Sequence, residues 1–184
     1  MDTGDIKEFF QSLIIAGILA FFIITFVAQS FVVDGGSMVP TLDNGERLFV
    51  NKFIYRFHPP ERGDIIVFTP NGASNKKYIK RVIGLPGDTV SIRDGTTYIN
   101  GEPIEEDYIN EEMDGDFGPY QVPEESVFVM GDNRNHSADS RFPSVVGFVD
   151  YDSISGKAFW VYWPITKMRI LEHEKYDLDE NDLG

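Results

Sequence analysis

An uncharged apolar run near the N-terminus limits what this chain can fold into more than any other feature of its sequence. From Phe9 to Val33 there are 25 consecutive residues without a charged side chain, most of them Ile, Phe, Leu, Ala or Val. At about 1.5 Å per residue, such a helix is roughly 37 Å long and can cross a hydrocarbon core of ~30 Å with some tilt. Because no charged face interrupts the run, a helix lying flat on a membrane surface is disfavoured. The sequence therefore predicts a transmembrane anchor over residues 9–33.

The residues before this run indicate whether the anchor is retained. A cleaved secretory signal has a basic start and a shorter apolar stretch. Residues 1–8 instead contain Asp2, Asp5 and Glu8 against a single basic side chain, Lys7. We therefore favour an uncleaved, single-pass anchor behind a short cytoplasmic N-terminus, residues 1–8. The rest of the chain is expected on the extracytoplasmic side of the cell membrane, although the positive-inside rule has only Lys7 and the α-amino group to act on.

Composition excludes several classes of protein. The 184 residues include 16 basic and 30 acidic side chains, which gives a net charge of −14. This balance argues against a general nucleic-acid binder, because phosphate binding needs clustered Lys and Arg. The lack of cysteine excludes disulfides, thiolate zinc sites and a cysteine nucleophile. We expect no metal and no cofactor, since the one polar segment that suggests a calcium loop, residues 130–141, has the wrong spacing of oxygen ligands.

Beyond residue 33 the sequence changes to short runs rich in β-branched and aromatic residues, separated by turn signals. Asp94-Gly95 between alternating runs predicts a hairpin, and Asn100-Gly101 a second tight turn. We predict a mainly β protein with a single N-terminal transmembrane helix and an all-β, barrel- or sandwich-like extracytoplasmic domain over residues 34–171, including a small hairpin insert at about 89–123. Residues 172–184 contain six acids and are expected to form a solvated acidic C-terminal tail. The expected strands are Arg47–Asn51, Asp64–Thr69, Tyr78–Gly84, Ser126–Met130 and Ala158–Trp163, with hairpins inside Thr89–Ile104.

Ser37 is the first candidate for chemistry. It lies in the segment DGGSMVPTL, Asp34–Leu42, where Gly35 and Gly36 leave room for another backbone to approach. A nucleophile needs such an exposed turn, with free backbone N–H groups that can stabilise an oxyanion. By itself the segment is more typical of a linker between a membrane anchor and a domain.

Lys80 is the second candidate, in the segment KKYIKRVIGLPG, residues 76–87. On a strand, Tyr78, Lys80 and Val82 share one face. Apolar neighbours remove water from a lysine amine and lower its pKa from about 10.4, and a fall of roughly 2–3 units would make it a base near neutral pH. The alternative, which the local sequence favours, is a lysine whose stem packs at the edge of the core while its amine stays in water.

The third candidate is the polar segment Met130–Arg141, MGDNRNHSADSR, directly after an apolar strand. Its density of Asp, Arg, Asn, Ser and His indicates a hydrogen-bonded turn system that supports something nearby.

Together with RGDIIVF, Arg62–Phe68, these segments occur in the order of the signature motifs of the bacterial type I signal peptidases, and the chain resembles this family over most of its length. The resemblance implies a membrane-bound serine endopeptidase that removes signal peptides from exported preproteins after small residues, at sites of the Ala-x-Ala type. It implies a catalytic dyad with Ser37 as the nucleophile and Lys80 as the general base. Lysine at this position, where eukaryotic and archaeal relatives carry histidine, indicates the bacterial kind.

The resemblance also implies a set of supporting residues. Ser137 would hydrogen-bond the Lys80 amine and orient it. Asp139 and Arg141 would brace this corner, and Asp132 with Arg81 would form a further structural pair.

The resemblance also implies where the substrate lies and what it contacts. An extended peptide would run against residues 31–36 and 78–80, beside shallow apolar pockets for small side chains. Gly35 departs from those members that carry a serine two residues before the nucleophile, whose hydroxyl completes the oxyanion hole. Together with the single anchor and the small insert, Gly35 resembles the compact Gram-positive form. The implied partners are preprotein signal peptides and the lipid bilayer, without nucleic acid, and the implied substrate-binding residues are Phe31, Val33, Gly35, Gly36, Leu42, Tyr78 and Ile79.

Two alternatives remain open at the level of sequence. Ser37, His136 and Asp139 could form a catalytic triad, although His136 and Asp139 are only three positions apart. The chain could also be a membrane-tethered β domain that binds a partner without catalysis.

Overall fold

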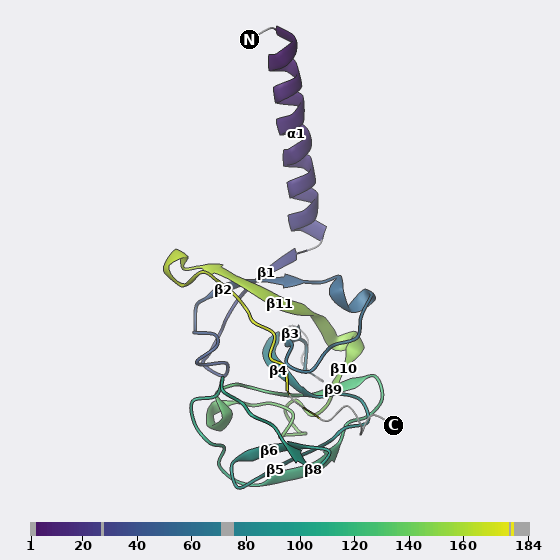
Figure 1. Cartoon of the computed structure of the whole chain (residues 1–184), viewed down its shortest axis with the longest axis vertical. Coiled ribbons are helices and arrows are strands. Elements are labelled where there is room, and N and C mark those ends of the chain that lie inside the picture. The colour runs from purple at the N-terminus through teal and green to yellow at the C-terminus, as the bar shows by residue number, and fades with distance from the viewer. Residues whose placement is uncertain (1–2, 27, 71–75, 177, 179–184) are drawn as a thin grey trace.

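The computed structural model describes residues 3–26, 28–70, 76–176 and 178, and these residues form one α-helix and two antiparallel sheets (Figure 1). The prediction of a mainly β chain with one N-terminal helix is confirmed. Helix α1, Thr3–Phe26, extends away from the sheets, which lie together beyond its C-terminal end (Figure 1). Within the residues that the structure describes, no helix combines the length and the hydropathy that a membrane crossing requires.

The helix ends before the apolar run does. Residues Ala28–Val32 form strand β1, which pairs with β2, Arg47–Asn51. The last part of the segment expected as an anchor over residues 9–33 is therefore a strand. The local sequence explains this, because polar Gln29 and Ser30 interrupt the apolar run and the β-branched Val32 and Val33 favour extended backbone.

The larger sheet carries Lys80, and the turn that contains Ser37 lies between two of its strands. Its strand order is β1-β2-β11-β3-β4-β9-β10, with β12 paired to β11. The expected strands 47–51, 78–84 and 126–130 are confirmed with the same bounds. Besides β1 and β2, the strands of this sheet are β3 (Ile65–Phe68), β4 (Tyr78–Gly84), β9 (Ser126–Met130), β10 (Val149–Asp150), β11 (Ile154–Trp163) and β12 (Arg169–Ile170). The short 3-10 helices are η1 (Ile54–Arg56), η2 (Arg134–His136), η3 (Tyr151–Ser153) and η4 (Ile165–Lys167).

The smaller sheet occupies the region expected as a hairpin insert. Its strand order is β7-β6-β5-β8. The turn between β5 and β6 has φ of 49° at Asp94 and 80° at Gly95, and two positive values are what a tight hairpin turn of this kind requires. The strands are β5 (Thr89–Arg93), β6 (Thr96–Ile99), β7 (Glu102–Pro103) and β8 (Phe117–Gln121).

The core covers both faces of the central strands. In β3 all four side chains are buried, and they alternate between two apolar clusters, Ile65 and Val67 on one side and Ile66 and Phe68 on the other. This alternation is the period of two that a strand imposes. A third cluster joins the two sheets through residues of β4, β5 and β9.

The start of the acidic C-terminal segment, expected as a solvated tail, packs partly against the domain: Glu172 and Lys175 are exposed, whereas His173, Glu174 and Tyr176 are half-buried. Tyr176 and Leu178 pack against the cluster that joins the two sheets. The Tyr176 hydroxyl lies 2.6 Å from that of Tyr108, and the His173 ring lies 3.0 Å from Asp64. The acids dominate the composition of the segment, but its few aromatic and apolar side chains decide where its first residues lie.

Candidate active site

The segment that carries Ser37 is a turn held to the core on both sides. It leaves β1 at Val33, which is buried, and passes Gly35 with φ of +99°, a conformation that favours glycine. Met38 directly after the serine is also buried, and the Leu42 N–H donates to the Met38 carbonyl at 2.8 Å. Ser37 is therefore presented at the edge of the core by buried neighbours.

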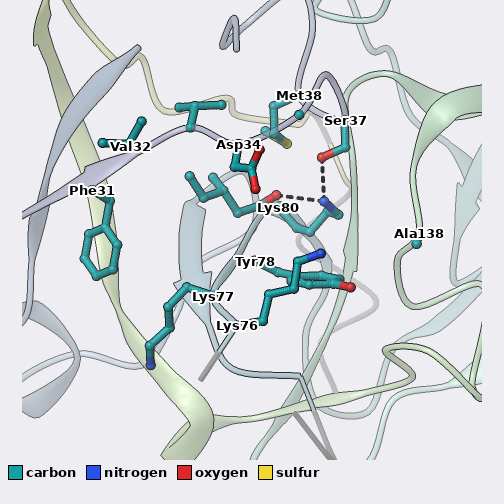
Figure 2. Close-up of a pocket in the computed structure, with 13 residues that line it drawn as sticks. Phe31, Val32, Asp34, Ser37, Met38, Lys76, Lys77, Tyr78, Lys80 and Ala138 are labelled. Atoms are coloured by element: carbon teal, nitrogen blue, oxygen red, sulfur yellow. Dashed lines mark hydrogen bonds between the residues drawn. The ribbon is translucent and has the colours of Figure 1, made fainter. Parts of the chain in front are cut away.

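Strand β4 brings Lys80 to this serine. The Lys80 side chain is almost fully buried, with 4% of its surface exposed. Its Nζ donates to Ser37 Oγ at 2.7 Å and to the Ile79 carbonyl at 3.0 Å, and it lies 5.4 Å from the centre of the Tyr78 ring. Figure 2 shows the hydroxyl and the amine pointing toward each other, with the Tyr78 ring beside the lysine stem. The alternative of a lysine with its amine in water is wrong.

Burial makes this amine a weaker base than an ordinary lysine. It lowers the pKa of Lys80 from 10.5 to about 8. The carboxylates of Asp139 and Asp132 act in the opposite direction, and the Arg141 guanidinium adds to the lowering. An amine with a pKa near 8 is substantially neutral in mildly alkaline water, so it can accept a proton from the hydroxyl that it contacts.

Two buried ion pairs keep the nearby carboxylates from binding Lys80 directly. Arg81 contacts both oxygens of Asp132, at 2.9 Å through Nε and 2.7 Å through Nη2. Arg141 contacts both oxygens of Asp139 at 2.8 Å. These are the two pairs that the resemblance implied. Because each carboxylate faces its own guanidinium, the lysine amine is left to the serine.

Ser137 does not make the hydrogen bond that the resemblance implied. Its Oγ is buried and has no hydrogen-bond partner within the described chain. The Lys80 amine donates instead to Ser37 and to the Ile79 carbonyl. The Ser137 Oγ lies against Gly131, where an added Cβ would overlap it.

A cavity of about 450 Å³ opens beside the Ser37–Lys80 pair. Two of the expected substrate-binding residues do not line it. Leu42 is fully buried in the core beneath the turn, and the Gly36 carbonyl accepts a hydrogen bond from Asn133 at 2.9 Å. The other five expected residues line the cavity, and so do several that sequence reasoning missed. The lining comprises Phe31, Val32, Val33, Asp34, Gly35, Ser37, Met38, Lys76, Lys77, Tyr78, Ile79, Lys80 and Ala138 (Figure 2).

The alternative triad is not assembled. The His136 side chain is 75% exposed, and its Nδ1 lies 3.9 Å from Glu111. The Asp139 carboxylate is engaged by Arg141. A histidine paired with a surface glutamate, and an aspartate paired with an arginine, cannot pass a proton from Ser37.

Sequence reasoning missed a second polar cluster that holds the MGDNRNHSADSR segment. Arg134 is buried and contacts both carboxylate oxygens of Glu106, and Tyr108 donates to the same carboxylate. Burial would raise the pKa of Glu106, but these hydrogen bonds and the Arg134 charge bring the pKa below its ordinary value. The only sequence signal was the density of polar residues around Arg134.

One group of described residues has the spacing of metal ligands. Ligand atoms of Glu61, Asp64 and His173 lie within 4.8 Å of one another. The Lys157 ammonium contacts the same Asp64 oxygen as His173 does, at 2.5 Å. The charge of Asp64 is thus already balanced by the protein, and the cluster is explained as a set of ion pairs.

Comparisons with known proteins identify the family to which this chain belongs. The family model described as "Signal peptidase, peptidase S26" matches residues 6–163. A signal peptidase I of Leptolyngbya laminosa is 46% identical over 158 residues, which cover 82% of this chain and 76% of that protein. Signal peptidase I T of Bacillus subtilis is 41% identical over 178 residues, covering 91% of this chain and 90% of that protein. A crystal structure of a signal peptidase I from Enterococcus faecalis has 40% sequence identity and a TM-score of 0.47, covering 53% of this chain and 95% of that chain.

The chain therefore belongs to the signal peptidase family, peptidase S26, and it is a peptidase.

Proposed function

We propose that this protein cleaves signal peptides from exported preproteins, with Ser37 as the nucleophile and Lys80 as the general base. The observation that carries the proposal is the 2.7 Å contact between Ser37 Oγ and the buried Lys80 amine, whose pKa is lowered to about 8. A serine hydroxyl is a weak nucleophile until an adjacent base takes its proton, and here the neutral amine is the base within reach.

Each step of the mechanism moves a proton through Lys80. The neutral amine takes the Ser37 proton as Oγ attacks the scissile carbonyl, and the tetrahedral oxyanion is stabilised by the Ser37 backbone N–H. The resulting ammonium gives that proton to the leaving nitrogen, so the amino terminus of the mature protein departs and the signal peptide stays as an ester on Ser37. The amine then takes a proton from water, the hydroxide attacks the ester, and Ser37 regains its proton as the signal peptide leaves with a carboxylate end.

The cavity beside the dyad suits an extended peptide with small side chains. Strand β1 lies at one edge of the larger sheet, and β4 pairs with β9 only from Arg81 onward. The Tyr78–Lys80 part of β4 thus keeps one side free for main-chain hydrogen bonds to a substrate, as in β-augmentation. The apolar side chains of Phe31, Val33 and Ile79 line the cavity between the two strands. We infer shallow subsites for the −1 and −3 residues and a preference for Ala-x-Ala sites.

We further propose that α1 anchors the protein in the cell membrane, with the sheets on the extracytoplasmic side. Phe9, Leu13 and Ile14 are each more than half exposed along the helix, and no other described element covers them. Contact with lipid chains would remove this apolar surface from water. The helix ends two residues before β1, so the catalytic turn would lie near the membrane surface, where a substrate's own apolar segment delivers its cleavage site.

The test is cleavage of a preprotein with an Ala-x-Ala site by the detergent-solubilised full chain. The wild-type protein and His136→Ala are expected to release the mature product. Ser37→Ala and Lys80→Ala are expected to lose at least 10³-fold in kcat, since catalysis without a member of such a dyad retains only binding and oxyanion stabilisation.

Two outcomes would refute the proposal. Loss of activity in His136→Ala with activity kept in Lys80→Ala would replace the dyad with a triad. A wild-type protein that binds the preprotein without cleaving it would indicate a binding module.

A further inference from the structure

Asn133 contacts the turn that carries Ser37, here called the nucleophile turn, at two consecutive peptide units. Its side-chain amide donates from Nδ2 to the Gly36 carbonyl at 2.9 Å. Its backbone N–H donates to the Ser37 carbonyl at 3.0 Å. One residue of the polar segment after β9 thus binds the carbonyls on both sides of the Ser37 backbone.

Close approach of the two segments makes these bonds possible. Gly131, two residues before Asn133, lies directly against the Ser37 carbonyl, and an added Cβ would overlap that oxygen. Asp139, through its Oδ2, accepts the Gly131 N–H at 3.0 Å, and the same carboxylate is held by Arg141. The contact between Asn133 and the turn is therefore backed by a buried ion pair, which limits its freedom to move.

The bond to Gly36 fixes the direction of the Ser37 N–H. The Gly36 carbonyl and the Ser37 N–H belong to the same peptide unit, which is trans. In a planar trans unit the C=O and N–H point in opposite directions. Holding the Gly36 oxygen against Asn133 consequently turns the Ser37 N–H away from the Asn133 segment. In the described part of the chain that N–H forms no backbone hydrogen bond of its own.

A single well-oriented donor matters more here than in relatives with an extra hydroxyl. Position 35 is glycine, so no side chain two residues before Ser37 can donate to an oxyanion. Resting on the proposed function, we propose that Asn133 is a positioning residue that orients the Ser37 N–H toward the oxyanion formed during acyl transfer. The Val39 N–H also donates to the Gly36 carbonyl, but at 3.3 Å, so the side-chain amide makes the shorter of the two bonds.

Asn133→Ala tests the proposal because it removes only one contact. The backbone N–H still binds the Ser37 carbonyl, so the turn keeps one of its two attachments. Complete loss of an oxyanion donor costs about 10²–10³ in kcat, and loss of its orientation should cost about 10–100-fold. Asn133→Asp, which has the same shape and no side-chain donor, should lose at least as much.

The matched control is Asn135→Ala. This residue has the same side chain in the same segment, but its amide binds the backbone of Glu112 and Asp114 in the loop that precedes β8. We expect its kcat to stay within about threefold of the wild type, as a surface change away from the reacting atoms should.

Steady-state kinetics, a pH profile and inhibitor binding together separate a positioning role from general damage to the fold. For Asn133→Ala we expect a lower kcat, an unchanged KM and an unchanged limb near pH 8, because the environment of Lys80 is untouched. A peptide aldehyde ending in alanine, which forms a tetrahedral adduct with the serine, should lose affinity by about the same factor as kcat/KM. A kcat within threefold of the wild type, a shifted pH limb or a loss confined to KM would overturn the inference. An inactive wild-type protein would instead refute the proposed function.

Discussion

At the scale of single residues, the lowered pKa of Lys80 predicts how the rate depends on pH. In the proposed mechanism only the neutral amine accepts the serine proton, and burial lowers the pKa of Lys80 to about 8. We therefore expect kcat/KM for preprotein cleavage to fall about tenfold per pH unit below the limb and to level off above it. A profile from about pH 6 to about pH 10 measures this, and a limb near the ordinary lysine value of ~10.4 would contradict it.

The same burial predicts that Lys80 destabilises the folded protein. Its pKa is about 8 in the folded chain against 10.5 for the free group, so folding disfavours the charged form. The cost, about 3 kcal/mol, is fully present below pH 8 and disappears as pH rises to about 10.5. Lys80→Met should therefore raise the free energy of unfolding by about 2–4 kcal/mol near pH 7 and change it little near pH 10.5.

Denaturant unfolding of the full chain in detergent at the two pH values measures the difference. Lys52→Met, at an exposed lysine, is the control and should show no such pH-dependent gain. An equal effect of Lys80→Met at both pH values would mean that burial does not destabilise the charged amine in the folded state.

At the scale of elements, the proposed active site depends on two turns that pack against each other without an intervening side chain. Gly131 follows β9, and a Cβ there would overlap the Ser37 carbonyl and the Ser137 hydroxyl. Gly131→Ala should push the nucleophile turn away from β4 and lengthen the Ser37–Lys80 contact. Since a misplacement of ~1 Å can cost 10²-fold, we expect kcat to fall by about that factor.

The rate of preprotein cleavage gives the result, and far-UV circular dichroism shows whether the sheets persist. If Gly131→Ala keeps full activity with an intact fold, the two turns have room to separate and the close packing is not required for catalysis.

At the scale of the whole molecule, the C-terminal segment contacts the polar network beside the proposed active site. The Tyr176 hydroxyl lies 2.6 Å from that of Tyr108, and the Tyr108 ring lies 4.0 Å from the Arg81 guanidinium that pairs with Asp132. Tyr176→Phe removes the hydrogen bond alone and should cost about 1 kcal/mol of unfolding free energy. Tyr176→Ala also removes the ring from the core and should cost about 2–4 kcal/mol.

Chemical denaturation of the two variants compares the hydrogen bond with the packing. Equal stability of Tyr176→Ala and the wild type would mean that the segment contacts the domain without stabilising its fold.

Several features could be predicted from the sequence because they depend on neighbours along the chain. Strands β2, β4 and β9 follow from short β-branched and aromatic runs, and the β5–β6 turn follows from Asp94-Gly95. The helix boundary was missed because the run was judged by its lack of charge, whereas the polar Gln29 and Ser30 and the pairing of β1 with β2 decide where the helix ends. The fate of the C-terminal segment was missed for a similar reason, because a single Tyr176 among acids gives no periodic signal.

What the sequence determined by itself is the list of chemical groups: one serine in a glycine-bearing turn, one lysine on an apolar strand, and a polar segment after another strand. Hydropathy and local backbone preference act over a few residues, and they suffice for that list. The tertiary structure decided that Ser37 and Lys80, 43 positions apart, lie 2.7 Å from each other, and that Asp132 and Asp139 face arginines instead of the amine. It also decided that Asn133 binds the turn and that Leu42 lies beneath it. Proton affinity and donor direction depend on burial and on partners distant in sequence, and only the packed sheets bring these together.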